Sequence, residues 1–174
     1  MDAYQVIRSL RSIRHFEDRP LPEEAVMRIL QAGRWSGSAK NTQPWHFIVV
    51  QNRATLEALS ACGSFASHLK GAALAVVIVT DPGRFGGFDS GRAAQNMMLA
   101  AWVDGIGSCI ATLHEETCAH QVLGVPDEYG CHTAISFGYP LAQDPQTIEG
   151  QPRKSVLANL GRRPLSDLVH WDKW

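Results

Sequence analysis

The spacing of apolar positions along the chain changes between helical and extended several times. Residues 2–10 repeat apolar side chains at helical spacing, and Asp2 is placed to cap that helix. Residues 23–34 show the same spacing directly after Pro22, a residue that suits the start of a helix. The apolar run over 72–80 is instead continuous, which is typical of a strand buried on both faces. The pattern therefore predicts a mixture of helices and strands.

The remaining segments complete the predicted order. Strands are expected at 45–51, 105–112 and 132–139, helices at 54–62, 89–103 and 115–123, and loops at 36–44 and 142–155. Helices and strands do not alternate in clean strand–helix–strand units, which favours an α+β fold over a doubly wound one. The length of 174 residues predicts one domain over 1–174.

The predicted helix at 89–103 differs from the others because it is apolar almost all round. Asp89 is placed to cap it, and after Gly91 its apolar side chains include Met97, Met98, Leu99, Trp102 and Val103. A helix of this kind is buried on every side. A chain of this length has little room for such burial, so a partner chain is one natural explanation. We expect a homodimer in which this helix packs on its own copy.

Composition and charge exclude several classes of function. Hydrophobic residues make up 45% of the chain and charged residues 19%, which suits a globular protein with one sizeable core. The formal net charge of −1 gives no general attraction to nucleic acid or to anionic lipid. The N-terminus does not read as a signal peptide, and no apolar run reaches membrane-spanning length. We therefore expect a cytoplasmic protein with neither a nucleic-acid nor a membrane partner.

The cysteines and histidines do not form a recognisable reactive or metal site. None of the four cysteines, Cys62, Cys109, Cys118 and Cys131, forms a CxxC pair, so four reduced thiols are expected in a cytoplasmic chain. The cluster of Cys109, His114, Cys118 and His120 matches no zinc spacing. We expect buried thiols, surface histidines and no metal.

Three short segments carry candidate binding chemistry. Arg11-Ser12-Ile13-Arg14 places two cations and a hydroxyl next to a chain turn, which makes either a phosphate cradle or a solvated turn. The segment 36–45 combines Gly and Ser, which let backbone approach a planar ligand, with Asn41 and Gln43, which could pair with a ring edge. Its alternative is a loop that caps the sheet. The segment 161–165 (GRRPL) is either a second cation site or an ordinary basic tail.

A fourth segment has the start of a dinucleotide-binding fingerprint. Gly105-Ile106-Gly107-Ser108 supplies two glycines at the right spacing, but position 110 is Ile where the third glycine is needed. The segment also follows a predicted helix instead of a strand. A Rossmann site is therefore rejected.

Taken together and in order, these segments resemble the nitroreductase superfamily of FMN enzymes. The opening Arg-Ser-Ile-Arg-His-Phe is similar to the family's RRSxRxF segment, and Ser38–Trp45 is similar to its PSxxNxQPW segment. The other matching segments are Asp89–Ala101, Gly105–Ser108, Val125–Pro126, Phe137–Pro140 and Gly161–Leu165. The resemblance implies an α+β, nitroreductase-like fold: a central, mostly antiparallel sheet flanked by helices, in an intertwined homodimer.

The resemblance also implies the site. It implies that FMN is held by Arg11, Ser12, Arg14, Ser38, Asn41, Gln43, Thr112, Leu113, Arg162 and Arg163. The arginines near the two ends would hold the phosphate. The Ser38 segment would line the isoalloxazine. Since the family shares each flavin between two chains, the resemblance allows both this segment and the tail to serve the flavin of the partner subunit. Backbone N–H groups of 111–114 would face the flavin N5, and no catalytic side chain is expected.

The implied activity is two-electron transfer from NADH or NADPH to a small acceptor, such as a nitroaromatic or a quinone, in a ping-pong cycle. Arg14 is the candidate cation that tunes the flavin. Alternatives are a reductive dehalogenase, a flavin-cleaving enzyme, a non-catalytic flavin carrier or sensor, and an interaction domain without FMN. Leu10 and Gly37 depart from an arginine and a proline of the family pattern, and the short chain implies a minimal substrate lid.

Overall fold

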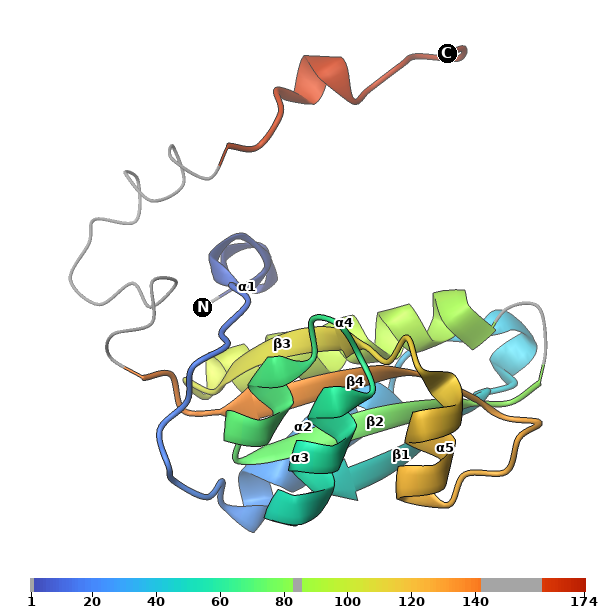
Figure 1. Ribbon diagram of the computed structural model, residues 1–174. Helices are drawn as coiled ribbons and strands as arrows, with labels where there is room; N and C mark the ends of the chain where they lie inside the picture. The colour runs from blue at the N-terminus through green and yellow to red at the C-terminus, as the bar shows by residue number, and fades with distance from the viewer. Residues whose placement is uncertain (1, 83–85, 142–160) are drawn as a thin grey trace.

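A computed structural model describes residues 2–82, 86–141 and 161–174 (Figure 1). The loop predicted at 142–155 lies outside these ranges. The helices are α1 (Ala3–Ser9), α2 (Glu23–Arg34), α3 (Arg53–Ala61), α4 (Gly86–Val103) and α5 (Glu116–Leu123). The strands are β1 (Trp45–Val50), β2 (Leu74–Thr80), β3 (Gly107–Thr112) and β4 (Gly130–Gly138), and short 3-10 turns occur at Ala39–Asn41, Ser67–Gly71 and Leu165–Asp167.

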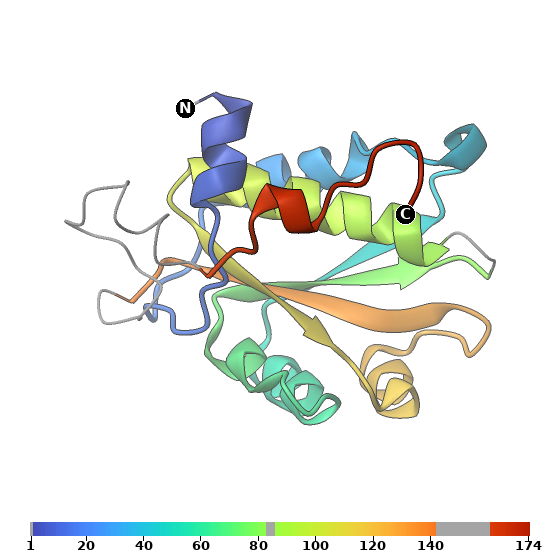
Figure 2. The same ribbon diagram turned by 90° about the horizontal axis from the view of Figure 1, so that it is seen from above.

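The four strands form one antiparallel sheet in the order β1-β2-β4-β3. Figure 2 shows the helices in two layers, with α2 and α4 on one side of the sheet and α3 and α5 on the other. The predicted α+β class, with an antiparallel sheet flanked by helices, is confirmed. In the described ranges, no helix is both long enough and apolar enough to cross a membrane.

The central strand β2 separates two hydrophobic cores. Because strand side chains alternate between faces, Leu74, Val76 and Ile78 pack toward α2 and α4. The intervening Ala75 and Val77 pack toward α3 and α5. This double burial explains why the strand has no polar alternation, as its apolar run predicts.

The helix boundaries follow from local chemistry in most places. Asp2 caps α1 by accepting a hydrogen bond from the amide of Gln5 at 2.8 Å, as predicted. The predicted cap at Asp89 is wrong, because α4 begins at Gly86 and Asp89 lies inside its first turn. The buried Asp89 carboxylate instead accepts a hydrogen bond from the amide of Ala39 at 3.1 Å, and so anchors the loop before β1.

The prediction that α4 is buried on every side does not hold within one chain. Ala93, Ala94 and Met97 are buried against the sheet and α2, but Phe88 is 73% exposed and Val103 is 49% exposed. The sheet covers one face of the helix only. The expected homodimer, which would cover the remainder, stays a prediction.

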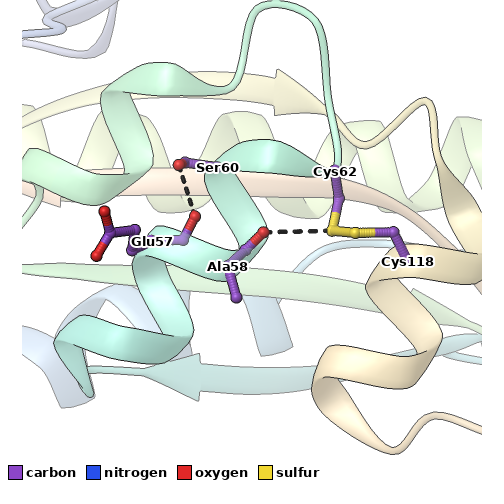
Figure 3. The surroundings of a disulfide bond; sticks show 5 residues. All are labelled: Glu57, Ala58, Ser60, Cys62 and Cys118. Carbon is purple, nitrogen blue, oxygen red and sulfur yellow. Dashed lines mark hydrogen bonds between the residues drawn. A yellow bond between two sulfur atoms is a disulfide. The ribbon is translucent and has the colours of Figure 1, made fainter.

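The prediction of four reduced thiols is wrong for one pair. Cys62, at the end of α3, and Cys118, in α5, are joined by a disulfide (Figure 3). Cys109 and Cys131 are free and buried. Fifty-six positions separate the bonded pair, so spacing gives no sign that folding places their Cα atoms 5.5 Å apart. The expectation of a surface histidine also fails at His120, which is buried on α5.

Two glycines allow the segment after α1 to lie close against the sheet. Ser12 forms a parallel bridge with Ser108 of β3, and Phe16 forms an antiparallel bridge with Pro140. A Cβ built on Gly107 would lie 2.8 Å from the Cβ of Ile13, and one on Gly138 would lie 2.8 Å from the ring of Phe16. No side chain fits at either position without displacing the segment.

We predict that Gly107→Ala displaces Ile13 and its flanking residues from the sheet. Overpacking of this kind costs about 1–3 kcal/mol of unfolding free energy, measurable by urea denaturation. Gly71→Ala is the matched control, because a Cβ at Gly71 meets no atom within 4 Å. Equal stability of the two variants would show that Gly107 is not needed for close approach.

Candidate functional site

A hollow of about 590 Å³ lies where α1, the following segment, α4, β3 and the C-terminal tail meet. Its lining residues are Ile7, Leu10, Arg11, Ser12, Arg14, Gln95, Met98, Cys109, Ile110 and Arg162. The structure thus brings together four residues singled out in the sequence from opposite ends of the chain. Its volume is in the range of small-molecule and cofactor sites.

Arg11 is the most buried cation of the hollow, with 8% of its surface exposed. One of its terminal nitrogens donates to the backbone carbonyls of Arg8 at 2.9 Å and Leu10 at 2.7 Å, which fixes the guanidinium at the end of α1. Its buried Nε has no hydrogen-bond partner. Burial lowers the pKa of Arg11, and the nearby positive charge of Arg162 lowers it further.

The backbone around Ile13 determines which neighbouring side chains face outward. Ile13 is fully buried, and its amide donates to the carbonyl of Ser108 at 2.9 Å. Extended backbone turns alternate side chains to opposite faces, so Ser12 and Arg14 are exposed at the hollow. The hydroxyl of Ser108, buried beneath them, has no partner.

His68 lies buried beneath the sheet, and nothing in the sequence singled it out. Its Nδ1 lies 2.8 Å from the hydroxyl oxygen of Ser136, which donates its own proton to the carbonyl of Cys109. Nδ1 therefore carries the imidazole proton, and the buried Nε2 has no partner. Burial, followed by the charge of Arg14, lowers the pKa of His68 to about 4, so the ring is neutral near pH 7.

The segment predicted to line the flavin ring, Ser38–Gln43, lies away from the hollow in the fold. None of Ser38, Asn41 and Gln43 lines the hollow; Gln43 instead lines a separate pocket of about 350 Å³ between α2 and β1. The Ser38 hydroxyl accepts from the amide of Gln43 at 2.8 Å. Lys40, Asn41 and Gln43 all have positive φ angles. Such strained backbone recurs at ligand-binding sites, where surrounding contacts hold it in place.

Three other predicted residues also lie outside the lining of the hollow. The amide of Leu113 donates to the carbonyl of His132 at 2.8 Å and its side chain is fully buried, so this N–H already has a partner within the chain. Thr112 is the exposed last residue of β3. Arg163 donates to the carbonyl of Asp167 at 2.9 Å, within the tail itself.

The hollow also contains residues to which the sequence gave no ligand role. Gln95 and Met98 are three positions apart on α4 and so share one helical face. Cys109 and Ile110 come from β3. The three-residue spacing predicts that Gln95 and Met98 share a helical face, but only the fold shows that this face meets the Arg11 segment.

The lining is suited to a ligand with an anionic end and an apolar body. Arg11, Arg14 and Arg162 are like charges that repel one another, and an anion among them would relieve that repulsion. The unpaired Nε of Arg11 and the hydroxyl of Ser12 could donate to its oxygens. Apolar side chains on α1, α4 and β3 would cover the remainder. A phosphate-bearing aromatic cofactor such as FMN fits this set of groups.

Comparison with known sequences identifies the family. The sequence model of the Nitroreductase family matches residues 7–81 and 66–139, which together include the Arg11 segment and the whole sheet. The chain is 34% identical over 184 residues to a provisionally named NADH dehydrogenase/NAD(P)H nitroreductase of Archaeoglobus fulgidus, covering 99% of both chains. A protein of the same name from Methanothermobacter thermautotrophicus is 31% identical, with 100% of this chain and 88% of the relative covered.

A solved structure supports the same assignment. An FMN-dependent nitroreductase of Clostridium difficile superposes with a TM-score of 0.82 at 26% identity, covering 97% of this chain and 98% of that one. The chain belongs to the Nitroreductase family and is an oxidoreductase of this class. The predicted family membership and enzyme class are confirmed.

The neutral His68 predicts an acid-dependent loss of stability. Its folded pKa of about 4 lies below the ordinary 6.5, so between these values the unfolded chain binds more protons than the folded one. The free energy of unfolding should therefore fall as pH is lowered through this window. In His68→Gln, which can still bond to Ser136, the fall should be smaller when followed by urea unfolding. An unchanged pH slope would contradict the assignment.

Proposed function

We propose that the protein is an FMN-dependent oxidoreductase that takes two electrons from NADH or NADPH and passes them to a small acceptor, such as a nitroaromatic or a quinone. The observation that carries the proposal is the hollow in which Arg11, Ser12, Arg14 and Arg162 converge. The NAD(P)H nitroreductase names of the archaeal relatives support the donor. Donor and acceptor would use the same site in turn.

Arg11 and Arg162 would hold the FMN phosphate from the two ends of the chain. Arg11 is pre-positioned by the Arg8 and Leu10 carbonyls, so little side-chain freedom is lost when an anion binds. The Ser12 hydroxyl adds a neutral donor beside them. Arg163 is not required for this role, because its guanidinium bonds within the tail.

Arg14 would provide the positive charge that favours the reduced flavin. The cofactor supplies the redox chemistry when bound, and the chain positions it and sets its electrostatic surroundings. Arg14 lines the hollow, whereas His68 beneath it stays neutral. Of these two residues, only Arg14 would therefore place a positive charge near the isoalloxazine ring. No side chain is assigned as a general acid or base.

The strained loop at Ser38–Gln43 would serve the flavin of a partner subunit. Its residues lie outside the lining of the hollow in the same chain, yet their backbone is held by Asp89 and Ser38 as binding loops commonly are. A homodimer that joins the loop of one chain to the hollow of the other would complete each site and cover the exposed face of α4.

The phosphate assignment predicts selective loss of FMN. Arg11→Ala should weaken FMN about 10- to 100-fold, because a charge-assisted contact is worth about 1.5–3 kcal/mol, but should weaken riboflavin little. Fluorescence quenching measures both affinities. Arg162→Ala should behave similarly, whereas Arg163→Ala should retain FMN. Equal losses of FMN and riboflavin in Arg11→Ala would place the phosphate elsewhere.

The redox assignment predicts rapid reduction of the bound flavin by NADH or NADPH in stopped-flow experiments. Arg14→Ala should slow this step and lower the midpoint potential by about 20–60 mV, or about 1–3 kcal/mol for two electrons. Arg14→Lys keeps the charge and should stay close to wild type. A flavin that neither donor reduces would make the protein a carrier or sensor. Coincident redox titrations of Arg14→Ala and wild type would remove Arg14 from this role.

The shared site predicts complementation between two defective variants. Arg11→Ala damages the hollow, and Asn41→Gly damages the loop while retaining its positive φ. Co-expression of the two as differently tagged chains should restore about a quarter of the flavin sites. With random pairing about half of the dimers are mixed, and one of the two sites in each mixed dimer is intact. If both residues act within one chain, every site keeps one defect and no activity returns.

A further inference from the structure

The disulfide between Cys62 and Cys118 joins two helices on the same face of the sheet (Figure 3). Cys62 follows the last residue of α3 and is fully buried, whereas Cys118, in the first turn of α5, is only half-buried. Of the two residues, Cys118 is therefore the more accessible to a thiol reagent from solution. Nothing in the site described above uses this pair.

The same two regions are also linked by bonds that do not depend on sulfur. The amide of Glu115 donates to the carbonyl of Cys62 at 2.9 Å, and the amide of Ser64 donates to Nδ1 of His114 at 3.3 Å. The ring of Phe65 packs edge-on against that of His114. The turn at 63–65 is thus tied to the segment 112–115, and the disulfide is one tie among several.

Both helices have hydrophobic anchors of their own. Leu56 and Leu59 of α3 and Ala119 of α5 are fully buried in the core beneath the sheet. Opening the disulfide would leave these contacts in place. The Sγ of Cys62 also lies 3.5 Å from the carbonyl oxygen of Ala58, an acceptor to which only the reduced thiol can donate. The fold therefore accommodates the pair in either state.

We propose that Cys62–Cys118 is a thiol–disulfide exchange site that a dithiol reductant opens and its disulfide form closes while the protein stays folded. A thiolate of the reductant attacks Sγ of Cys118, the bond between the two protein sulfurs breaks, and Cys62 leaves as a thiolate that takes a proton. The second thiol of the reductant then attacks the mixed disulfide and releases the Cys118 thiol. Two electrons and two protons pass to the protein, and the reductant becomes a disulfide.

The state of this site sets how firmly the turn at 63–65 is held against 112–115. With the sulfur link open, the amides of Ser64 and Glu115 keep their acceptors but lose the covalent constraint beside them. Their local opening should become more frequent, while the central strands stay protected by the two cores. The proposal concerns the chain itself and does not depend on FMN binding.

The test equilibrates the native protein in buffers of reduced and oxidised dithiothreitol at graded ratios. At each ratio all free thiols are trapped by denaturing the protein in iodoacetamide, and the labelled cysteines are located by mass spectrometry. The expected result is a reversible transition in which Cys62 and Cys118 gain label together. Hydrogen exchange at the Ser64 and Glu115 amides should rise at least about 10-fold in the reduced protein, with β2 and β4 unchanged.

The double variant Cys62→Ser with Cys118→Ser is the matched control. The Ser64 and Glu115 amides of this variant should exchange hydrogen as fast as those of the reduced wild type. Dithiothreitol should not change these rates. A disulfide that never forms in oxidising buffer, or one that is reduced only with global unfolding, would overturn the proposal. Unchanged exchange at both amides would overturn its local effect. FMN affinity is measured in parallel. A protein that does not bind FMN would contradict the proposed function but would leave each of these outcomes unchanged.

Discussion

The close approach of the segment at 12–16 to the sheet is the constraint on which the candidate site depends. Gly107 and Gly138 leave no room for a side chain beneath Ile13 and Phe16, so the segment lies against β3 and the end of β4. Ile13 is buried as a result, and its neighbours must face the hollow. The backbone geometry of this segment thus brings a hydroxyl and a cation to the site.

The electrostatics of the site follow from that placement. Arg11 is held at the end of α1, where burial and the charge of Arg162 lower its pKa. The cost of gathering cations falls when a dianionic phosphate lies among them, which makes anion binding the natural use of the arrangement. Beneath the sheet, His68 remains neutral and adds no further charge.

Much of the fold could be predicted because local patterns determine it. Helix α2 has the predicted bounds, and β2 shows the burial that its apolar run indicates. The Arg11 segment and Arg162 were also identifiable from residue type and family resemblance. The Cys62–Cys118 bond, the buried His68 and the contact between Asp89 and Ala39 were not, since each joins residues separated by 50 or more positions. Such contacts arise from tertiary packing, and no local spacing encodes them.

A crystal structure of the protein grown with FMN tests the central claim most directly. The account predicts a homodimer in which the phosphate lies within hydrogen-bond distance of Arg11, Ser12 and Arg162 of one chain. The isoalloxazine should extend toward the Ser38–Gln43 loop of the other chain. A flavin bound away from the Arg11 segment, or one whose phosphate contacts none of these residues, would contradict the account.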